Sequence, residues 1–480
     1  MQVSRVAAAF AVVQLLVFGL LARDIPLSGD EIWYFHVSKL IPSLISHAVH
    51  FDFDGAGVVL GAIVDRGWFM PGMAIVVAPV TFFTDSVPIT RLYVGTLNFT
   101  AIAAIFFYLQ KAYGARGPLI YLFCCLLVPY YLIFCFTIWG DLVAAHLLLS
   151  VVLLIFHRRN GSMPPGLAFA AAIGVALGVI TMLRGFYWAF APLIAVLVVL
   201  QTSAGEPLLA RFRLAAAPSC ALLLGLAVVL APWTVMITRD HGFHLTTTST
   251  TVSRMILIGS DEYFSRLQRD PCGNPDRSLQ RDISAVHNYI RCVAQRDQRT
   301  YAAQARLELA SSIAAVSYAE KVRSIGANVR NFFFDTEAFL RRFDRISNAS
   351  PDNPKAEWRH ALFEILMKLN HWGWRALLAI AILLFFTPMS LATNNLFLST
   401  VYKFSVGLYS THPFTVDAHG RYYVEYMPMI AVAIAAFAST PRPLLAGKLP
   451  DDSLQWLVLA GQAIALFVAP ALALAYFAAI

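Results

Sequence analysis

Charged residues are scarce in this chain. Only 13% of its 480 residues are Asp, Glu, Lys or Arg, whereas 58% are hydrophobic and the mean hydropathy is +0.65. A soluble protein needs more polar surface than this composition supplies. The shortage therefore excludes a soluble globular protein and predicts a polytopic membrane protein. The formal net charge of +8 requires no nucleic-acid partner, because Arg and Lys collect at the ends of membrane spans.

The sequence also lacks a P-loop and a dinucleotide-binding fingerprint. This absence fits an active face outside the cytoplasm, where ATP and nucleotide-sugars are scarce. We find no internal repeat, and charges within the apolar runs are few apart from Lys403. A transporter or flippase for lipid or polysaccharide would carry paired charges within its spans and halves of similar hydropathy. That class remains the alternative to an enzyme.

Apolar runs of the chain predict about eleven membrane-spanning helices. They cover residues 6–21, 89–109, 118–136, 138–156, 167–183, 186–200, 214–237, 374–389, 396–409, 422–437 and 454–477. The first run also resembles a signal peptide, but we favour an uncleaved helix. Residues 70–83 are apolar yet short, and we interpret them as interfacial or re-entrant. That choice places most basic loops on the side of the N-terminus, as the positive-inside rule prefers.

This topology divides the chain into three parts. Residues 1–237 form a transmembrane module whose first outer loop covers 22–90, residues 238–371 form a mostly helical extracytoplasmic domain, and residues 372–480 form the last transmembrane helices. The expected fold is an all-α bundle with extracytoplasmic juxtamembrane helices. A composition rich in Ala and Arg suggests a bacterium, so we expect the inner membrane and a periplasmic site.

Four of the six cysteines lie inside predicted spans, where apolar packing explains them most simply. Cys272 and Cys292 fall in the outer domain, which we expect to be oxidising. We predict a disulfide between them. A metal site there is less favoured, because no Cys-x-x-Cys or His pair accompanies them.

An acidic pair follows the first apolar run, where residues 27–34 read Leu-Ser-Gly-Asp-Glu-Ile-Trp-Tyr. Acids at membrane depth are costly and tend to mark function. We interpret Asp30 as a candidate catalytic base and Glu31 as a residue that orients its neighbours or binds an acceptor. The alternative role for Asp30 is a cap on a juxtamembrane helix that starts at Glu31, with Gly29 as the turn.

Two further patterns stay open. His36, His47, His50, Asp52 and Asp54 resemble a metal cluster, but residues 51–54 alternate like a short strand or turn, and we do not favour a metal. Apolar residues also recur at helical spacing between positions 309 and 332, surrounded by arginine and lysine. This pattern predicts a long helix that packs on its own domain or lies on the membrane surface.

Several short motifs follow one another in the order found in GT-C glycosyltransferases of the protein-mannosyltransferase and aminoarabinose-transferase group. These motifs are Asp30-Glu31, the run Asp65-Arg-Gly-Trp-Phe-Met-Pro71, Asp141 at the start of a helix, Leu183-Arg-Gly185, Pro232-Trp233 with Arg239-Asp240 and residues 246–251, and Arg421-Tyr422 with Pro428. The chain resembles this group, whose members use polyprenyl-phosphate sugars. The likeness extends over most of the chain, and the order of the motifs carries it.

The chain departs from the family pattern in two places. The family often has two prolines preceded by Lys or His, whereas Pro71 stands alone with Arg66 as the nearest cation. The Arg-Asn of the family is Arg239-Asp240 here. These departures do not change the predicted enzyme class, but they leave the substrate unspecified. A lipid, a glycan and a protein all remain open as the acceptor.

Sugar transfer from a polyprenyl phosphate requires a carboxylate that takes the acceptor's proton and cations that stabilise the leaving phosphate. Asp30 is the expected base, and Arg66, Arg184 and Arg421 are the expected phosphate ligands. The resemblance implies a single displacement with inversion. Some relatives use a divalent ion, but we expect no cofactor. Five further residues are candidates for the site, with no particular role expected of them: Asp65, Asp141, Tyr34, His419 and Tyr422.

Simpler interpretations of some candidates remain. Asp141 would also serve as a cap on the helix that follows it. Arg184 and Arg421 stand beside aromatic residues and would also serve as interfacial anchors.

Overall fold

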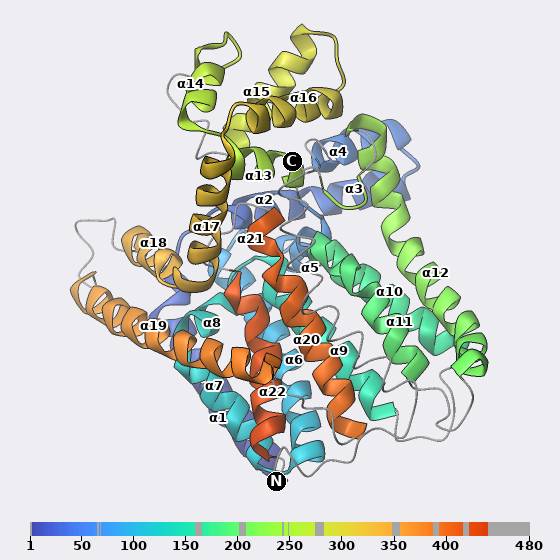
Figure 1. Cartoon of the computed structure of the whole chain (residues 1–480), viewed down its shortest axis with the longest axis vertical. Helices are drawn as coiled ribbons and strands as arrows, with labels where there is room; N and C mark the ends of the chain where they lie inside the picture. The colour runs from blue at the N-terminus through green and yellow to red at the C-terminus, as the bar shows by residue number, and fades with distance from the viewer. Residues whose placement is uncertain are drawn as a thin grey trace.

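A computed structural model describes most of the chain. It covers residues 2–64, 67, 69–158, 166–200, 208–241, 244–247, 249–273, 283–347, 356–386, 393–415 and 422–439. All regular structure in these ranges is helical, so the all-α prediction is confirmed (Figure 1). The predicted span at 454–477 lies outside the described residues.

The described part of the chain consists of the following helices, in chain order. They are α1 (Gln2–Leu20), η1 (Ala22–Asp24), α2 (Asp30–Ser38), α3 (Leu40–Val49), α4 (Phe53–Val64), α5 (Gly72–Thr81), α6 (Val87–Tyr113), α7 (Arg116–Leu127), α8 (Pro129–Phe134), α9 (Gly140–Arg158), α10 (Leu167–Leu183), η2 (Gly185–Phe190), α11 (Ala191–Leu200), α12 (Leu208–His241), α13 (Ser249–Ile258), α14 (Asp261–Arg269), α15 (Ile283–Arg296), α16 (Tyr301–Ala314), α17 (Tyr318–Phe334), α18 (Ala338–Ser347), α19 (Ala356–Phe386), α20 (Thr393–Ser410), α21 (His412–Thr415) and α22 (Tyr423–Ser439).

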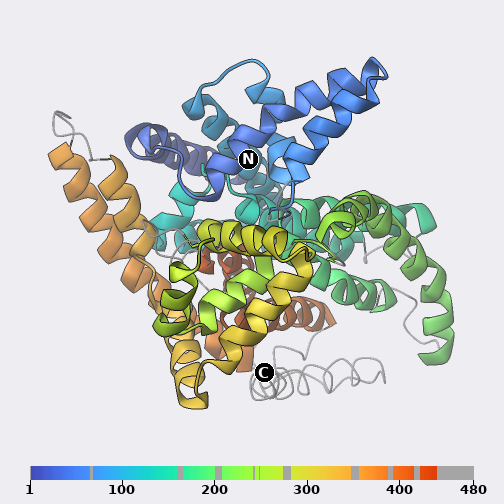
Figure 2. The ribbon, with the colours of Figure 1, turned by 90° about the horizontal axis from the view of Figure 1, so that it is seen from above.

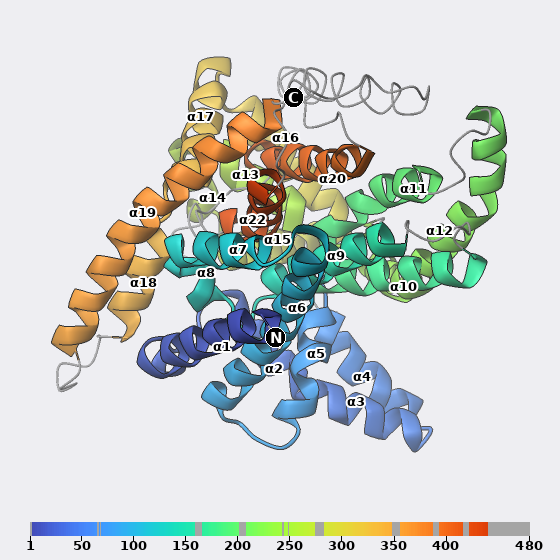
Figure 3. The ribbon, with the colours of Figure 1, turned by 90° about the horizontal axis from the view of Figure 1, so that it is seen from below.

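Two of the described helices are long and apolar enough to cross a membrane. They are α6 and the part of α12 between Arg213 and Arg239. Shorter apolar helices, among them α1, α9, α10 and α22, accompany them. Helix α6 contacts α1, α7, α9 and α22, and these helices form the central bundle (Figure 3). Helix α5 has only ten residues and packs on α2, α6 and α10, so it is too short to cross.

The predicted span at 118–136 is wrong as a single helix, because the chain breaks at Val128 between α7 and α8. Pro129 has no N–H and disfavours helical backbone in the residue before it. Val128 accordingly adopts φ −124° and ψ 75°. The N–H of Tyr130 then donates to Oδ1 of Asn370 at 3.1 Å, so α19 satisfies a donor that the broken helix exposes.

Helices α10 and α12 pack closely through glycine. A Cβ atom at Gly174 would lie 2.0 Å from the carbonyl oxygen of Leu222, and one at Gly225 would lie 2.3 Å from that of Ala171. Small residues let two apolar helices approach at backbone distance, where dispersion contacts hold them together. This contact fixes α10, whose end carries Arg184.

We expect Gly174→Ala to destabilise the protein by about 1–3 kcal/mol, because the added methyl forces the two backbones apart. Thermal unfolding in detergent measures the loss. Gly326→Ala in α17 is the matched control, since nothing lies within 4 Å of a Cβ at that position. The control variant should gain slightly from helix propensity. Equal effects of the two substitutions would contradict this account of the α10–α12 contact.

Helices α13 to α16 form a small unit with its own hydrophobic core (Figures 1 and 2). Its buried residues are Val252, Met255, Tyr263, Phe264, Leu267, Ala285, Val286, Tyr289, Ile290, Val293 and Ala305. The outer domain predicted at 238–371 is therefore divided in its packing. Its later helices join the main core instead, through Phe332, Leu340, Phe343, Phe363 and Met367.

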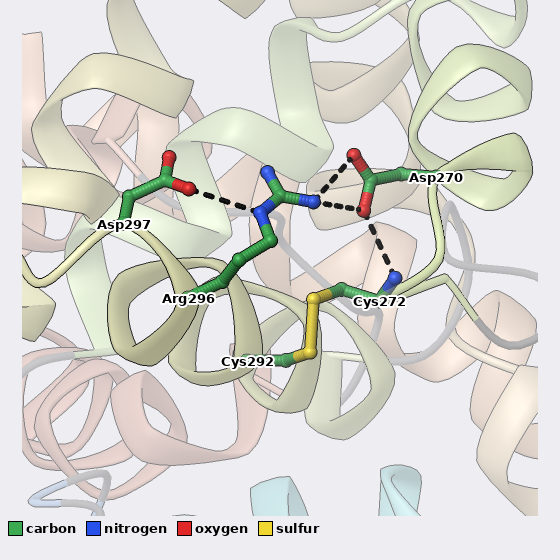
Figure 4. The surroundings of a disulfide bond; sticks show 5 residues. All are labelled: Asp270, Cys272, Cys292, Arg296 and Asp297. Atoms are coloured by element: carbon green, nitrogen blue, oxygen red, sulfur yellow. Dashed lines mark hydrogen bonds and ion pairs between the residues drawn. A yellow bond between two sulfur atoms is a disulfide. The ribbon is translucent and has the colours of Figure 1, made fainter.

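Cys272 and Cys292 form a disulfide in this outer unit, as the sequence led us to expect, with Cα atoms 5.6 Å apart. An ion pair lies beside the disulfide (Figure 4). Arg296 donates to both oxygens of Asp270 at 3.0 and 3.2 Å, and to Asp297 at 2.9 Å. The disulfide and the ion pair together fasten the end of α14 to α15.

The helical pattern between positions 309 and 332 is not one helix. It stops at the end of α16 and restarts in α17, where Ser317 and Glu320 form a capping box. Helix α16 packs in the outer unit, whereas the end of α17 packs on the main core. There the ring of Phe332 lies 5.6 Å from that of Tyr426. Helix α17 therefore links the outer unit to the bundle.

Candidate functional site

Asp30 is the first residue of α2, and its side chain is half-buried. Gly29 occupies the N-cap position with φ 58° and ψ −129°, a conformation open mainly to glycine. The interpretation of Asp30 as a cap is therefore wrong, because the helix begins at Asp30 itself. A carboxylate in the first turn is favoured by the helix dipole.

Glu31 is fully buried, with an exposed fraction of 0%. Both of its oxygens accept from Arg91 Nη2, at 2.8 and 3.1 Å. The backbone N–H groups of Ser28 and Ile138 donate to the same carboxylate at 3.1 and 2.9 Å. With its acceptor positions occupied in this way, Glu31 suits the orienting role and is poorly placed to act as a base or to touch an acceptor.

Arg91 is the partner that the sequence did not reveal. It lies in the second turn of α6, only 1% exposed, and donates to the carbonyl oxygens of Ala22, Ile25 and Pro26 as well as to Glu31. The segment between α1 and α2 is therefore held on α6 by charge-assisted bonds. The sequence did contain one indication of its role, because Arg91 is a charged residue just inside the predicted span at 89–109.

The Glu31 carboxylate connects two of the predicted motifs, Asp30-Glu31 and the helix start at Asp141. Ile138 lies in the link between α8 and α9, and its bond to Glu31 fixes that link against the start of α2. Asp141 follows in the first turn of α9 and is 2% exposed. The buried ion pair of Glu31 and Arg91 therefore helps to fix the starts of both α2 and α9, where Asp30 and Asp141 lie.

Arg184 lies where α10 ends and meets two acids. Its Nε atom is 3.0 Å from Oδ1 of Asp141 and 3.9 Å from Oε1 of Glu425, and its guanidinium lies 5.2 Å from the ring centre of Tyr422. Of the predicted site residues, the structure therefore brings Asp141, Arg184 and Tyr422 together. Glu425 lies in the first turn of α22 and is 2% exposed. It was not among the site candidates expected from the sequence, although an acid near the start of an apolar run indicates a functional position.

Buried aromatic side chains surround Glu425. The hydroxyl groups of Tyr187 and Tyr409 lie 2.6 Å apart, and Tyr187 donates to Oε2 of Glu425 at 3.5 Å. The rings of Phe186 and His412 lie 4.1 Å apart on the same side. Aromatic walls lower the local dielectric, which strengthens the interaction of Arg184 with anions.

The remaining candidates differ in what the structure describes. Tyr34 is buried, and its ring packs against Trp33 at 5.3 Å and Phe69 at 5.7 Å. Asp65, Arg66, His419 and Arg421 lie outside the described residues.

The histidine and aspartate residues near position 50 shape a turn between α3 and α4. Asp52 accepts from the N–H of Gly55 at 2.9 Å and pairs with Nδ1 of His47 at 2.7 Å, and these contacts lower the pKa of Asp52. Nδ1 of His50 lies 2.7 Å from the carbonyl oxygen of Ser46. Of the two forms predicted for residues 51–54, a short strand or a turn, the turn is confirmed and the strand is wrong, since α4 begins at Phe53. Across the described ranges, no three His, Cys, Asp or Glu side chains are grouped for a metal.

Among the described residues, the fold and the site define an all-α protein with two apolar helices of membrane length and with buried ion pairs at three acidic helix starts, those of α2, α9 and α22. No family model matches the chain, and no curated protein or solved structure matches it either.

Proposed function

We propose that this chain is a membrane glycosyltransferase that moves a sugar from a polyprenyl phosphate to a lipid, glycan or protein acceptor. Its site faces the periplasmic side of a bacterial inner membrane, and the chain crosses that membrane about eleven times. The two membrane-length helices and the shorter apolar helices support the membrane location. The order of the motifs supports the class.

One observation carries the proposal. The buried pair of Glu31 and Arg91 leaves the adjacent carboxylate of Asp30 half-buried at the start of α2. A buried ion pair contributes little net stability, and fixing geometry is among its attested uses. Here that geometry positions Asp30 relative to Asp141, as a pre-organised base requires.

The proposed reaction is a single displacement at the sugar. Asp30 takes the proton of the acceptor hydroxyl while the acceptor oxygen forms a bond to the anomeric carbon of the sugar. The bond between that carbon and the phosphate oxygen breaks at the same time, and the polyprenyl phosphate leaves as an anion. Attack opposite the leaving group inverts the anomeric carbon.

Arg184 is the described cation best placed for the phosphate. Its side chain is 19% exposed, and its Nε atom forms ion-pair contacts with Asp141 and Glu425. We propose that the terminal N–H donors of the guanidinium bind the phosphate. A guanidinium presents such donors in a fixed fork that fits phosphate oxygens. The two acids then hold the guanidinium in orientation.

We expect Arg184→Gln to raise the KM for the donor about 10- to 100-fold, because a charge-assisted bond to phosphate contributes about 1.5–3 kcal/mol. The KM for the acceptor should change little. Steady-state kinetics with each substrate varied in turn measures the split. Arg213→Gln, an exposed arginine of α12, is the control and should leave both values unchanged. A rise confined to the acceptor KM would contradict the assignment.

The proposed function is tested by incubating the purified protein with a panel of polyprenyl-phosphate sugars and candidate acceptors, with mass spectrometry of the products. A product one sugar heavier than the acceptor supports a transferase. Transport of polyprenyl-phosphate sugars across proteoliposomes without any such product would instead support the transporter alternative.

A further inference from the structure

The first half of α19 presents three kinds of surface. Its buried side packs on the main core and includes Arg359, Phe363, Met367, Asn370 and Trp374, none more than 6% exposed. The rest of the helix circumference is exposed or partly exposed, and it is divided lengthwise into an apolar stripe and a polar stripe.

The apolar stripe consists of Trp358, Ile365, Leu369 and Trp372, which are 43%, 63%, 41% and 68% exposed. Their spacings of seven, four and three residues place them on one side of the helix. Leu383, 67% exposed, continues the same line into the apolar second half of α19. The stripe is therefore continuous with a predicted membrane span.

The polar stripe runs beside it and carries Glu357, His360, Glu364, Lys368, His371 and Arg375. Helix α18 and the link before it cover part of this stripe. Nδ1 of His360 lies 2.7 Å from Oδ2 of Asp344, and Nδ1 of His371 lies 2.6 Å from Oε1 of Glu337. The guanidinium of Arg375 lies 5.8 Å from the ring centre of Trp372, at the border of the two stripes.

Contacts of Arg359 fix the start of α19 beside the end of α1. Arg359 donates to the carbonyl oxygen of Leu21 at 3.2 Å and lies 3.4 Å from Asp24, just beyond the end of α1. The first turn of α19 thus stands at the outer end of the first apolar helix. Figures 1 and 3 show α19 running obliquely along the edge of the bundle with α18 beside it.

We infer that the first half of α19 lies in the outer interfacial layer of a phospholipid bilayer, with its apolar stripe toward the acyl chains and its polar stripe toward the headgroups. Tryptophan with neighbouring Lys and Arg is the residue set that this layer favours. A helix with separate apolar and charged faces lies in the plane of such an interface. Lys368 and Arg375 match the negative charge of phosphates. The occupant is lipid, because the stripe continues into a span that lipid must also cover.

The inference does not depend on the reaction. It does set the depth of the site, because Arg359 holds α19 against the segment between α1 and α2, whose other end carries Asp30. Asp30 then stands at headgroup level, within reach of a phosphate on a lipid chain.

The test uses the full-length protein in nanodiscs, with bromine on the lipid acyl chains near the headgroup as a fluorescence quencher. The signal of Trp372 is the difference between wild type and Trp372→Phe, since the other eight tryptophans, exposed or buried, are common to both proteins. We expect brominated lipid to quench this difference signal about twofold or more, and aqueous iodide to quench it less.

The control moves the fluorophore to the polar stripe by adding Glu364→Trp to Trp372→Phe. Its signal should respond more to iodide than to brominated lipid. If Trp372 behaves like this control, water rather than lipid covers the stripe, and the inference is overturned. Failure of both quenchers to reach Trp372 overturns it too, because protein would then cover the stripe. Neither result affects the transferase assay.

Discussion

Asp30→Asn should lower sugar transfer about 10²- to 10⁴-fold, the usual contribution of a general base. Asparagine keeps the size of the side chain and one accepting oxygen but cannot take a proton from the acceptor hydroxyl. Because Asp30 is only half-buried and asparagine has nearly the same shape as aspartate, we expect folding and membrane insertion to be retained. Product formation under saturating donor and acceptor measures the loss.

The control for this substitution is Asp54→Asn in the same outer loop. Asp54 is exposed in the first turn of α4, so it shares with Asp30 a place at a helix start. Transfer by Asp54→Asn should equal that of the wild type. If Asp30→Asn retains wild-type transfer with intact folding, the base is another group. Loss of transfer with retained donor binding separates a missing base from a damaged site.

The meeting of Asp141, Arg184 and Tyr422 could be predicted from the sequence in part. Each stands at an end of an apolar run, and the ends of crossing helices gather at the same face of a membrane. Glu425 and Arg91 obey the same physics, but each lies inside an apolar run by a few residues. Hydropathy averaged over a window of residues does not reveal a single charge of this kind. An acid or a cation at such a position nevertheless needs an ion-pair or hydrogen-bond partner.

Other features depend on contacts that a single sequence does not contain. Arg91 and Glu31 are 60 residues apart, and only the packing of the segment between α1 and α2 on α6 brings them together. The break between α16 and α17 was readable in principle, because Ser317 and Glu320 have the spacing of a capping box. The helical spacing of apolar residues continued across that break, so the pattern predicted a single helix. For the break between α7 and α8, in contrast, Pro129 was a direct sequence signal.

Arg91→Met should destabilise the protein by about 3–5 kcal/mol, the usual effect of removing one partner of a buried ion pair. The substitution leaves the Glu31 carboxylate buried without its cation. It also leaves the carbonyl oxygens of Ala22 and Pro26 without the donor they use. Thermal unfolding in detergent, compared with the wild type, measures the change.

The double variant Glu31→Gln with Arg91→Met separates packing from positioning. Neutralising Glu31 removes the uncompensated charge, so the double variant should be more stable than Arg91→Met alone, though still below the wild type because the loop carbonyls stay unpaired. If the pair serves to position Asp30, transfer should remain low in this partly restabilised protein, since the link from α6 to the start of α2 is gone. Recovery of transfer in step with stability would show that the pair serves folding alone, and Asp30 would need another explanation for its placement.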